Sequence, residues 1–237
     1  MNTDPNPTHV LPDYSTHDEI YQKLRARGAN GWNNEQSEDY AQMLAFVAPA
    51  LPTSASESPL QLLELGCGAG NFSALLAERG FSVTGVDISP TAIDWAISRA
   101  VERNVNATFR FDNVVQLSSV TENTFDVLVD SHCLHCIIGN DRRQCLESAY
   151  RVLKPGGTLV VLTMCGEVTN PQMLLSFAPL SKTVLHGGRP TRYIGSAKDI
   201  TAELSDAGFL IDYVNVVPRI DVYDLDNLVL GARKPPV

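Results

Sequence analysis

Two hydrophobic periodicities alternate along the chain from residue 60 onward. Short apolar runs are typical of buried strands, whereas apolar residues that recur every three or four positions are typical of one face of a helix. The runs predict strands over 61–65, 82–87, 108–111, 125–129 and 158–164, and a final pair over 209–217 and 228–232. The longer period predicts helices over 72–78, from 90 onward, over 141–153 and over 196–207. Strands that alternate with helices predict a mainly parallel sheet covered on both faces.

The N-terminal quarter of the chain shows no such alternation. Its pattern predicts a loose polar tail to about residue 15, helices over 18–27 and 38–48, and a linker rich in Pro and Ser over 49–59. We therefore expect an N-terminal helical part over 1–59 that packs on a main α/β domain over 60–237. Within the main domain, about 171–195 is less regular and predicts an insertion near the strand ends.

Three glycines follow the first predicted strand at alternate positions, namely Gly66, Gly68 and Gly70, and a helical pattern begins at once. Glycine tolerates a positive φ and lets the backbone approach a ligand closely, so this turn is a candidate ligand cradle. Ligands of open α/β sheets bind beyond the carboxyl ends of the strands. Asp87 ends the second strand, where a carboxylate can accept hydrogen bonds from both hydroxyls of a ribose.

The spacing of the glycines distinguishes between classes of cofactor. A dinucleotide site favours G-x-G-x-x-G, but here Asn71 occupies the position of the third glycine in that pattern. Glu64, two residues before the first glycine, would be poorly placed near a pyrophosphate and suits a cationic or zwitterionic ligand. Both observations weaken the alternative of a nicotinamide-dependent dehydrogenase.

The amino-acid composition limits the kinds of partner and compartment that we expect for this protein. The formal net charge of −9 over 237 residues argues against a nucleic-acid partner, because phosphate backbones are bound by clustered Lys and Arg. No apolar run approaches the roughly 18 residues of a membrane span, and the polar N-terminus does not resemble a signal peptide. Five scattered cysteines do not form a disulfide framework and fit a reducing compartment, so we expect a cytoplasmic protein.

Several ordered motifs resemble those of class I S-adenosylmethionine-dependent methyltransferases. They are Glu64-Leu-Gly-Cys-Gly-Ala-Gly70, Val86-Asp-Ile-Ser89, Phe111-Asp-Asn113, Phe125-Asp-Val-Leu-Val-Asp130 and Leu153-Lys-Pro-Gly-Gly-Thr-Leu159. The resemblance covers roughly 60–165 strongly, and several motifs in order are a more specific signal than any one alone. It implies a Rossmann-like, seven-stranded, mainly parallel sheet whose last strand is antiparallel, with S-adenosylmethionine as cofactor.

The resemblance also implies roles for individual residues. The glycine turn would line the methionine part of the cofactor, Asp87 would hold its ribose, and Asp112 would accept from the adenine amino group. The N-terminal helices would act as a lid over cofactor and acceptor. The cofactor-binding residues predicted in this way are Tyr21, Trp32, Glu64, Gly66, Cys67, Gly68, Gly70, Asn71, Asp87, Ile88, Asp112, Asn113, Asp130 and Ser131.

The segment from His132 to Cys136 has two interpretations. His-x-x-His and Cys-x-x-Cys are interleaved here, and such ligands suit zinc, but four ligands within five residues can hardly converge on one tetrahedral ion. We therefore expect no metal. The resemblance instead places the segment after the fourth strand, facing the acceptor. His132 is then the first candidate for a general base and a substrate contact, and His135 the second, with packing as the simpler role.

The predicted insertion carries Arg189, Arg192 and Tyr193 on a glycine-bearing loop. These side chains could hold a carboxylate or phosphate of the acceptor, or they could be ordinary solvated surface residues. We expect an enzyme that methylates N, O or S of a small molecule. Methylation of a protein or RNA, and a regulator that binds the cofactor without transferring its methyl group, remain as alternatives. A base need not be present, because alignment with the sulfonium supplies much of the rate.

Overall fold

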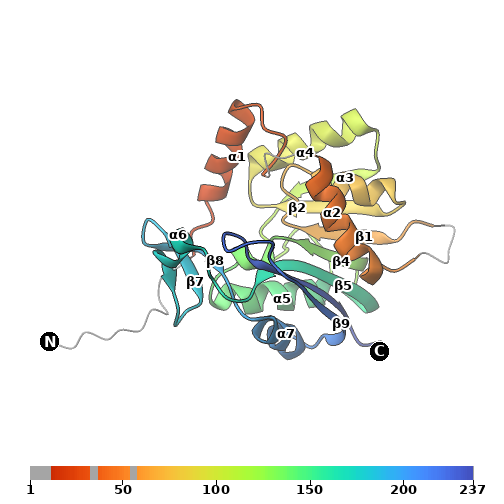
Figure 1. Ribbon diagram of the computed structural model, residues 1–237. Helices are drawn as coiled ribbons and strands as arrows, with labels where there is room; N and C mark the ends of the chain where they lie inside the picture. Colours follow the sequence, from red (N-terminus) through yellow and green to blue (C-terminus); the bar gives the residue numbers. More distant parts are fainter. Residues whose placement is uncertain (1–11, 33–36, 54–57, 237) are drawn as a thin grey trace.

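A seven-stranded sheet forms the centre of the protein (Figure 1). The structure is a computed structural model that describes residues 12–32, 37–53 and 58–236. The strand order is β3-β2-β1-β4-β5-β10-β9, and β10 runs antiparallel to both of its neighbours. The strands are β1 (Gln61–Leu65), β2 (Ser82–Asp87), β3 (Ala107–Phe111), β4 (Phe125–Ser131), β5 (Leu153–Cys165), β9 (Leu210–Val217) and β10 (Asp226–Arg233). The predicted fold class is confirmed.

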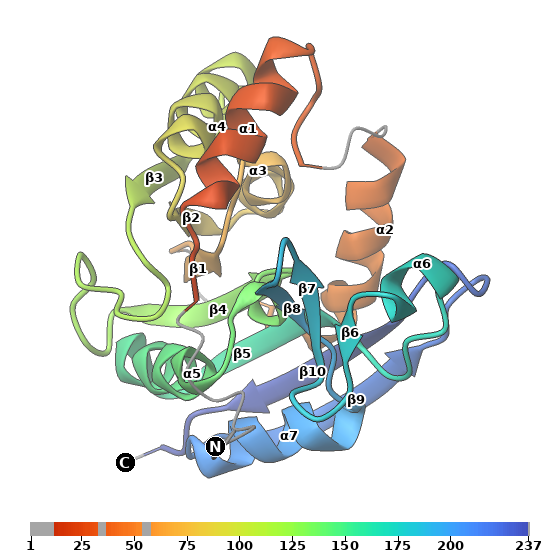
Figure 2. The same ribbon diagram turned by 90° about the vertical axis from the view of Figure 1, so that its left-hand side faces the viewer.

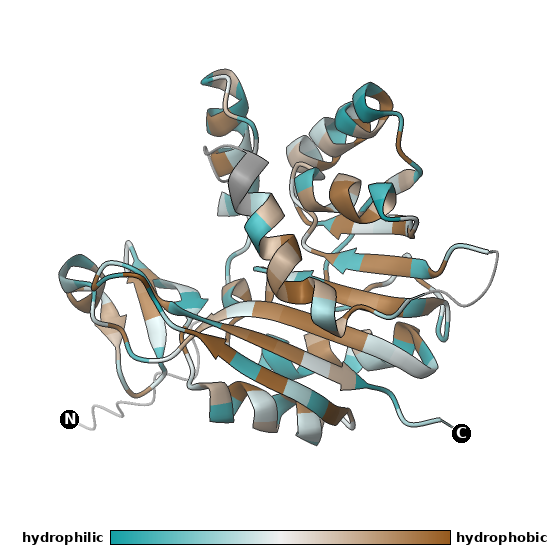
Figure 3. Cartoon of the chain, turned by 45° about the vertical axis from the view of Figure 1, so that its right-hand side comes forward, coloured by the Kyte–Doolittle hydropathy of each residue, from teal (hydrophilic) through white to brown (hydrophobic). Residues whose placement is uncertain are grey.

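Helices cover both faces of this sheet, as the alternating pattern predicts (Figure 2). The helices on one face are α2 (Ser37–Val47), α3 (Asn71–Glu78) and α4 (Pro90–Arg103), and those on the other are α5 (Asn140–Val152) and α7 (Ala197–Asp206). Short 3-10 turns follow α2 (Ala48–Ala50) and β4 (η3, Leu134–Cys136). The central strands are buried on both sides and therefore read as continuous apolar runs, which appear brown in Figure 3.

Local signals fix the helix ends where the sequence predicts them. The Ser89 hydroxyl accepts a hydrogen bond from the Ala92 N–H at 3.0 Å, so it caps α4, and Pro90 occupies the first helical position. Ser196 and Asp199 form a reciprocal capping box at the start of α7. These caps set the direction in which each helix leaves the ligand-binding edge of the sheet.

The predicted insertion contains short regular elements, which the apolar pattern did not indicate. It contains a short helix, α6 (Pro171–Leu174), and a three-stranded antiparallel sheet of β6 (Phe177–Ala178), β7 (Thr183–His186) and β8 (Arg189–Tyr193). Strands of two to five residues are too short to show a period, which is why the pattern predicted none. The hairpin between β7 and β8 turns at Gly187 and Gly188, both with positive φ.

Helix α1 (Thr16–Ala26) lies across the start of α4 (Figure 2). The Asp18 carboxylate accepts from the Ser89 hydroxyl at 2.6 Å and from the Thr91 N–H at 3.0 Å. Ahead of the helix, where a loose tail was predicted, the Tyr14 hydroxyl donates to Asp141 of α5 at 3.0 Å. The helix is therefore fastened to both faces of the main domain. None of the helices in the described ranges is long and apolar enough to cross a membrane.

Candidate active site

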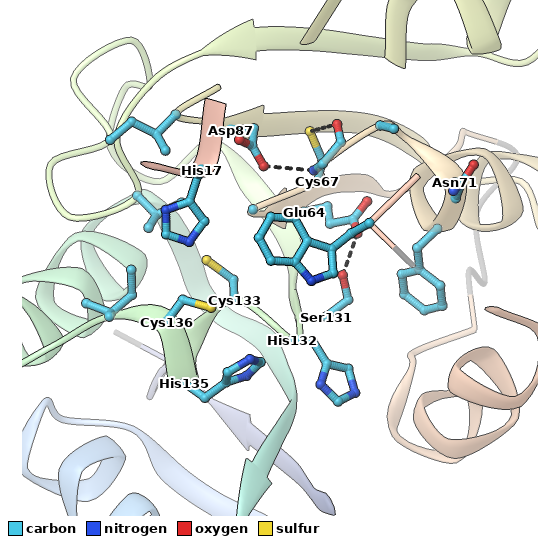
Figure 4. Close-up of a pocket in the computed structure, with 18 of the residues that line it drawn as sticks. His17, Glu64, Cys67, Asn71, Asp87, Ser131, His132, Cys133, His135 and Cys136 are labelled. Carbon is cyan, nitrogen blue, oxygen red and sulfur yellow. Dashed lines mark hydrogen bonds between the residues drawn. The ribbon is translucent and has the colours of Figure 1, made fainter. Parts of the chain in front are cut away.

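A cavity of about 240 Å³ lies between the carboxyl ends of the central strands and the N-terminal helices (Figure 4). Its lining includes fourteen of the residues that the sequence proposed. They are Tyr21, Trp32, Glu64, Gly66, Cys67, Gly68, Asn71, Asp87, Ile88, Asn113, Ser131, His132, His135 and Arg192. The sequence thus located the cavity, whereas the contacts of these residues with a ligand remain predictions.

The glycine turn is held by Asp87. One carboxylate oxygen accepts from the Gly68 N–H at 2.8 Å, and the other accepts from the Ser89 N–H at 2.8 Å. Asp87 is buried, and burial raises the pKa of its carboxyl. Gly70, predicted to touch the cofactor, lies outside the cavity lining, because it is the N-cap of α3 and packs against Ala96 of α4. It serves the turn rather than the cavity surface.

Tyr21 of α1 covers this turn. Gly68 has φ +52°, and a Cβ placed on it would lie 2.3 Å from the Tyr21 hydroxyl oxygen but 3.3 Å from the ring carbon that carries it. Gly68→Ala is expected to lose about 1–2 kcal/mol of stability from the left-handed backbone and more from this overlap. Tyr21→Phe removes the hydroxyl, so the double variant should recover the part due to overlap. Thermal unfolding of the single and double variants measures both contributions.

Gly28 supplies the control for that experiment. It has φ +71° and no atom within 4 Å of a Cβ placed there, so Gly28→Ala reports backbone strain alone. An equal loss at both glycines, unaffected by Tyr21→Phe, would show that Tyr21 does not press on the turn.

Two buried carboxyl groups lie under the methionine end of the predicted site. Glu64 lines the cavity and accepts hydrogen bonds from the hydroxyls of Ser73 and Ser131, the latter at 2.5 Å. Burial raises the pKa of Glu64 to about 7 and that of Asp130 to about 7. Asp130 lies outside the cavity lining and accepts from the Cys133 N–H at 3.3 Å. Within the described ranges Glu64 has no ion pair.

The structure does not bring Asp112 into the cavity lining. One of its carboxylate oxygens accepts from the Ser119 N–H at 2.7 Å and from the Ser119 hydroxyl at 2.6 Å. The other accepts from the Asn113 N–H at 2.8 Å and from the Ser118 hydroxyl at 3.2 Å. Near this loop the cavity is lined instead by Ile88, Asn113 and the apolar Val114. Asp112 therefore shapes its own loop, which leaves the predicted adenine contact without a free acceptor.

His132 and His135 face each other across the floor of the cavity, with ring centroids 5.6 Å apart (Figure 4). His132 has φ +67°, which turns the chain sharply from β4 into η3. Burial, aided by the positive charge of Arg192, lowers the pKa of His132 to about 4, and burial lowers that of His135 well below its usual range. Both rings are therefore neutral at pH 7. The described part of the chain contains no group of three His, Cys, Asp or Glu side chains placed for a metal ion.

Only one of the three side chains predicted to bind the acceptor lines the cavity. Arg192 lines the cavity, but Arg189 forms an ion pair with Asp13 and Tyr193 packs under the guanidinium of Arg142, 4.0 Å from its ring centroid. Arg189 and Tyr193 are thus not part of the lining. Neighbours in a strand point to opposite faces, which separates Arg192 from Tyr193, whereas the pairing of β7 with β8 is irregular between Arg189 and Arg192, and Arg189 is held outside the cavity by Asp13.

The sequence did not indicate much of the apolar lining, nor several lining residues from the N-terminal part of the chain. These residues are Tyr14, His17, Tyr40, Met43, Ala69, Phe72, Val114, Cys133, Cys136, Ile137 and Met164. His17 stacks on Trp32 with ring centroids 5.7 Å apart and points into the cavity (Figure 4). The aromatic spacing of Tyr14, His17 and Tyr21, which places them on one side of a helical turn, was the available signal.

Comparisons with known proteins agree with this geometry. Residues 63–161 match the family described as "Methyltransferase domain". Over 105 residues the chain is 32% identical to the ubiquinone biosynthesis O-methyltransferase of Caulobacter vibrioides, covering 44% of this chain and 41% of that protein. An S-adenosylmethionine-dependent methyltransferase from Methanosarcina mazei is 25% identical, with a TM-score of 0.65 over 81% of this chain and 97% of its own. Residues 63–161 are thus similar to a methyltransferase domain, and the sheet has the strand order expected for the class I fold.

The extent of the similarity differs between the comparisons. The matched region spans about two fifths of the length of the curated O-methyltransferases, so their whole activity is not transferred with it. The [4+2]-cyclase SpnF has a TM-score of 0.71, covers 96% of this chain and 98% of its own, and is 18% identical. That likeness concerns the fold alone, because one fold supports several reactions.

The cavity fits the cofactor of class I methyltransferases, S-adenosylmethionine. Glu64 is a buried carboxylate without a cationic partner in the described ranges, which is costly unless a cation binds. The cofactor carries a sulfonium and an ammonium group. The Asp87 carboxylate also lines the cavity and supplies the acceptor that ribose hydroxyls require.

Proposed function

We propose that this protein transfers the methyl group of S-adenosylmethionine to a nitrogen, oxygen or sulfur atom of a small molecule. The observation that carries the proposal is the position of Glu64 and Asp87. These two buried carboxylates open into the same cavity as His132 and Arg192, where no other described group balances the charge of Glu64. A site for a cationic nucleoside thus adjoins a pocket for a second, small ligand. The name of the Caulobacter relative supports a small-molecule acceptor.

The side chains act mainly by binding and orientation. Asp87 would hold the ribose, Glu64 would face the positive end of the cofactor, and Tyr21 would cover the turn and exclude water. When bound, the cofactor supplies an electrophilic methyl group on a sulfonium. His132 is neutral and able to accept a hydrogen bond from the acceptor, but its lowered pKa makes it a weak base. Alignment is therefore expected to contribute more than proton transfer.

Calorimetric titration of S-adenosylmethionine, S-adenosylhomocysteine and NAD tests the cofactor. The proposal predicts binding of the first two and none of NAD. Methyl transfer is then followed with methyl-labelled cofactor and a set of small phenols, amines and thiols, with mass spectrometry of the products. Absence of cofactor binding overturns the proposal. Binding without transfer to any small molecule supports the alternatives of a protein or RNA acceptor, or of a cofactor-binding protein with another role.

A further inference from the structure

The charges that line the cavity are separated into two ends. Asp87 and Glu64 lie at the glycine turn, whereas Arg192 of β8 lies beside η3, where its positive charge acts on His132 and His135. Figure 4 shows Asp87 at one end of the cavity and the two histidines at the other. If the cofactor occupies the acidic end, the acceptor meets the end that carries the arginine.

The guanidinium of Arg192 is the unusual group at this end. Arg142, which is buried, donates to the carbonyls of Leu134 and Ile137 and pairs with Glu203 at 2.6 Å. Arg99, also buried, donates to backbone carbonyls of the glycine turn and of Asn30. By contrast, Arg192 is half-buried against the cavity, and its guanidinium has no hydrogen bond or ion pair among the described residues. Its five donors are available to a ligand.

The surroundings of Arg192 provide no internal counter-charge. The nearby His132, His135 and Cys136 are uncharged at pH 7, since burial lowers the pKa of each imidazole and raises that of the thiol to about 11. Of the carboxyl groups that line the cavity, Asp87 is held by the Gly68 and Ser89 N–H groups and Glu64 by the hydroxyls of Ser73 and Ser131, so neither is paired with Arg192 in the described ranges. The acceptor end therefore carries one uncompensated positive charge.

We propose that Arg192 binds a single carboxylate of the methyl acceptor, so that the substrate is a small organic monocarboxylate. This inference rests on the proposed methyltransferase function. The planar guanidinium matches a carboxylate through two parallel hydrogen bonds. One cation balances a monoanion, whereas a phosphate dianion would leave a net negative charge beside apolar walls.

The other residues that line the cavity indicate the polarity of the rest of the acceptor. Met43, Ile137 and Met164 present apolar surface to the cavity, and Met164 also packs with Val184 and Ile194 beside β8. Methionine walls adapt to flat or irregular apolar ligands. The carboxylate held by Arg192 fixes one end of such a molecule, and its nucleophilic atom then lies toward Ser131, whose hydroxyl is hydrogen-bonded to Glu64. The acceptor is an apolar or aromatic acid with its nucleophile remote from the carboxylate.

Paired ligands test this assignment in the absence of a known substrate. The protein is saturated with S-adenosylhomocysteine and titrated with small aromatic and aliphatic carboxylates, each paired with its primary amide and its phosphonate, by ligand-observed NMR. The expected result is at least one acid that binds about tenfold more tightly than its amide and its phosphonate. Arg192→Gln should abolish that preference, and Arg192→Lys should retain part of it. Arg189→Gln is the matched control, because Arg189 lies outside the cavity.

The outcomes separate the two proposals. Binding of S-adenosylhomocysteine to every variant with wild-type affinity shows that the fold and the cofactor site are intact. Against that background, the absence of any acid-over-amide preference, a preference for the phosphonate, or a preference that survives Arg192→Gln overturns the carboxylate site. Failure of S-adenosylhomocysteine to bind the wild-type protein overturns the proposed function instead.

Discussion

Replacement of Asp87 by Ala is expected to lower the affinity for S-adenosylhomocysteine by about a hundredfold. The carboxylate accepts from the Gly68 and Ser89 N–H groups, both at 2.8 Å, and it lines the cavity. Its removal leaves two buried donors unpaired, loosens the glycine turn and deletes the acceptor for the ribose hydroxyls. A hydrogen bond to a charged group contributes about 1.5–3 kcal/mol, so the loss of the ribose acceptor alone accounts for a decrease of this size. Calorimetric titration gives the dissociation constants.

Two further substitutions give that experiment its controls. Asp87→Asn keeps the shape of the side chain, but its single carbonyl oxygen replaces only one of the two acceptors, so an intermediate loss of about tenfold is expected. Asp94→Ala changes an exposed carboxylate of α4 and should leave the affinity unchanged. Wild-type affinity in Asp87→Ala would show that the carboxylate serves only the turn and that another group holds the ribose.

The affinity for S-adenosylmethionine is expected to rise with pH between about pH 6 and about pH 8. Burial raises the pKa of Glu64 to about 7, so in the free protein this carboxyl is partly protonated near neutrality. A bound cation favours the charged form, and binding therefore releases a proton. Below pH 7 the affinity should fall by up to about tenfold per pH unit. Titrations in buffers of different ionisation enthalpy count the released protons.

The Glu64→Gln variant separates the contribution of Glu64 to this pH dependence from that of the other titratable groups. The variant should bind the cofactor more weakly at pH 8 and show a shallower pH dependence, with Asp130 accounting for what remains. The sign for stability is opposite: a pKa above the unfolded value favours folding at low pH, and this contribution is lost as the pH rises through 7. The free Glu64→Gln protein should therefore unfold at a higher temperature than the wild type at pH 8. An unchanged pH profile would contradict the role of Glu64.

The main fold follows from signals that are local in the sequence. Residues 82–87 were predicted as a strand and are β2, and the helix predicted from residue 90 onward is α4, which begins at Pro90. Such signals depend on the period of the apolar residues and on caps that satisfy the nearest backbone groups. They place the carboxyl ends of the strands, and with them the glycine turn and Asp87, without knowledge of distant contacts.

The candidate site was less predictable where it depends on tertiary contacts. The Asp112 motif looked like an adenine contact, but its own loop folds back and occupies both oxygens through Ser118 and Ser119. Arg189 and Arg192 looked equivalent in a loop, but a strand there leaves Arg192 in the cavity lining and Arg189 outside it. His17 reaches the cavity only because α1 docks on α4, and no short-range pattern determines where a helix docks.

Helix α1 is connected to Asp87 by a chain of hydrogen bonds. Asp18 of α1 accepts from the Ser89 hydroxyl, the Ser89 N–H donates to Asp87, and Asp87 also holds Gly68. A ligand that fixes Asp87 therefore also favours the docked position of α1. Thermodynamic reciprocity requires that docking strengthen ligand binding by the same factor. We expect the departure of the spent cofactor to wait for α1 to undock, so that weakening the contact of Asp18 speeds release before it alters the methyl-transfer step.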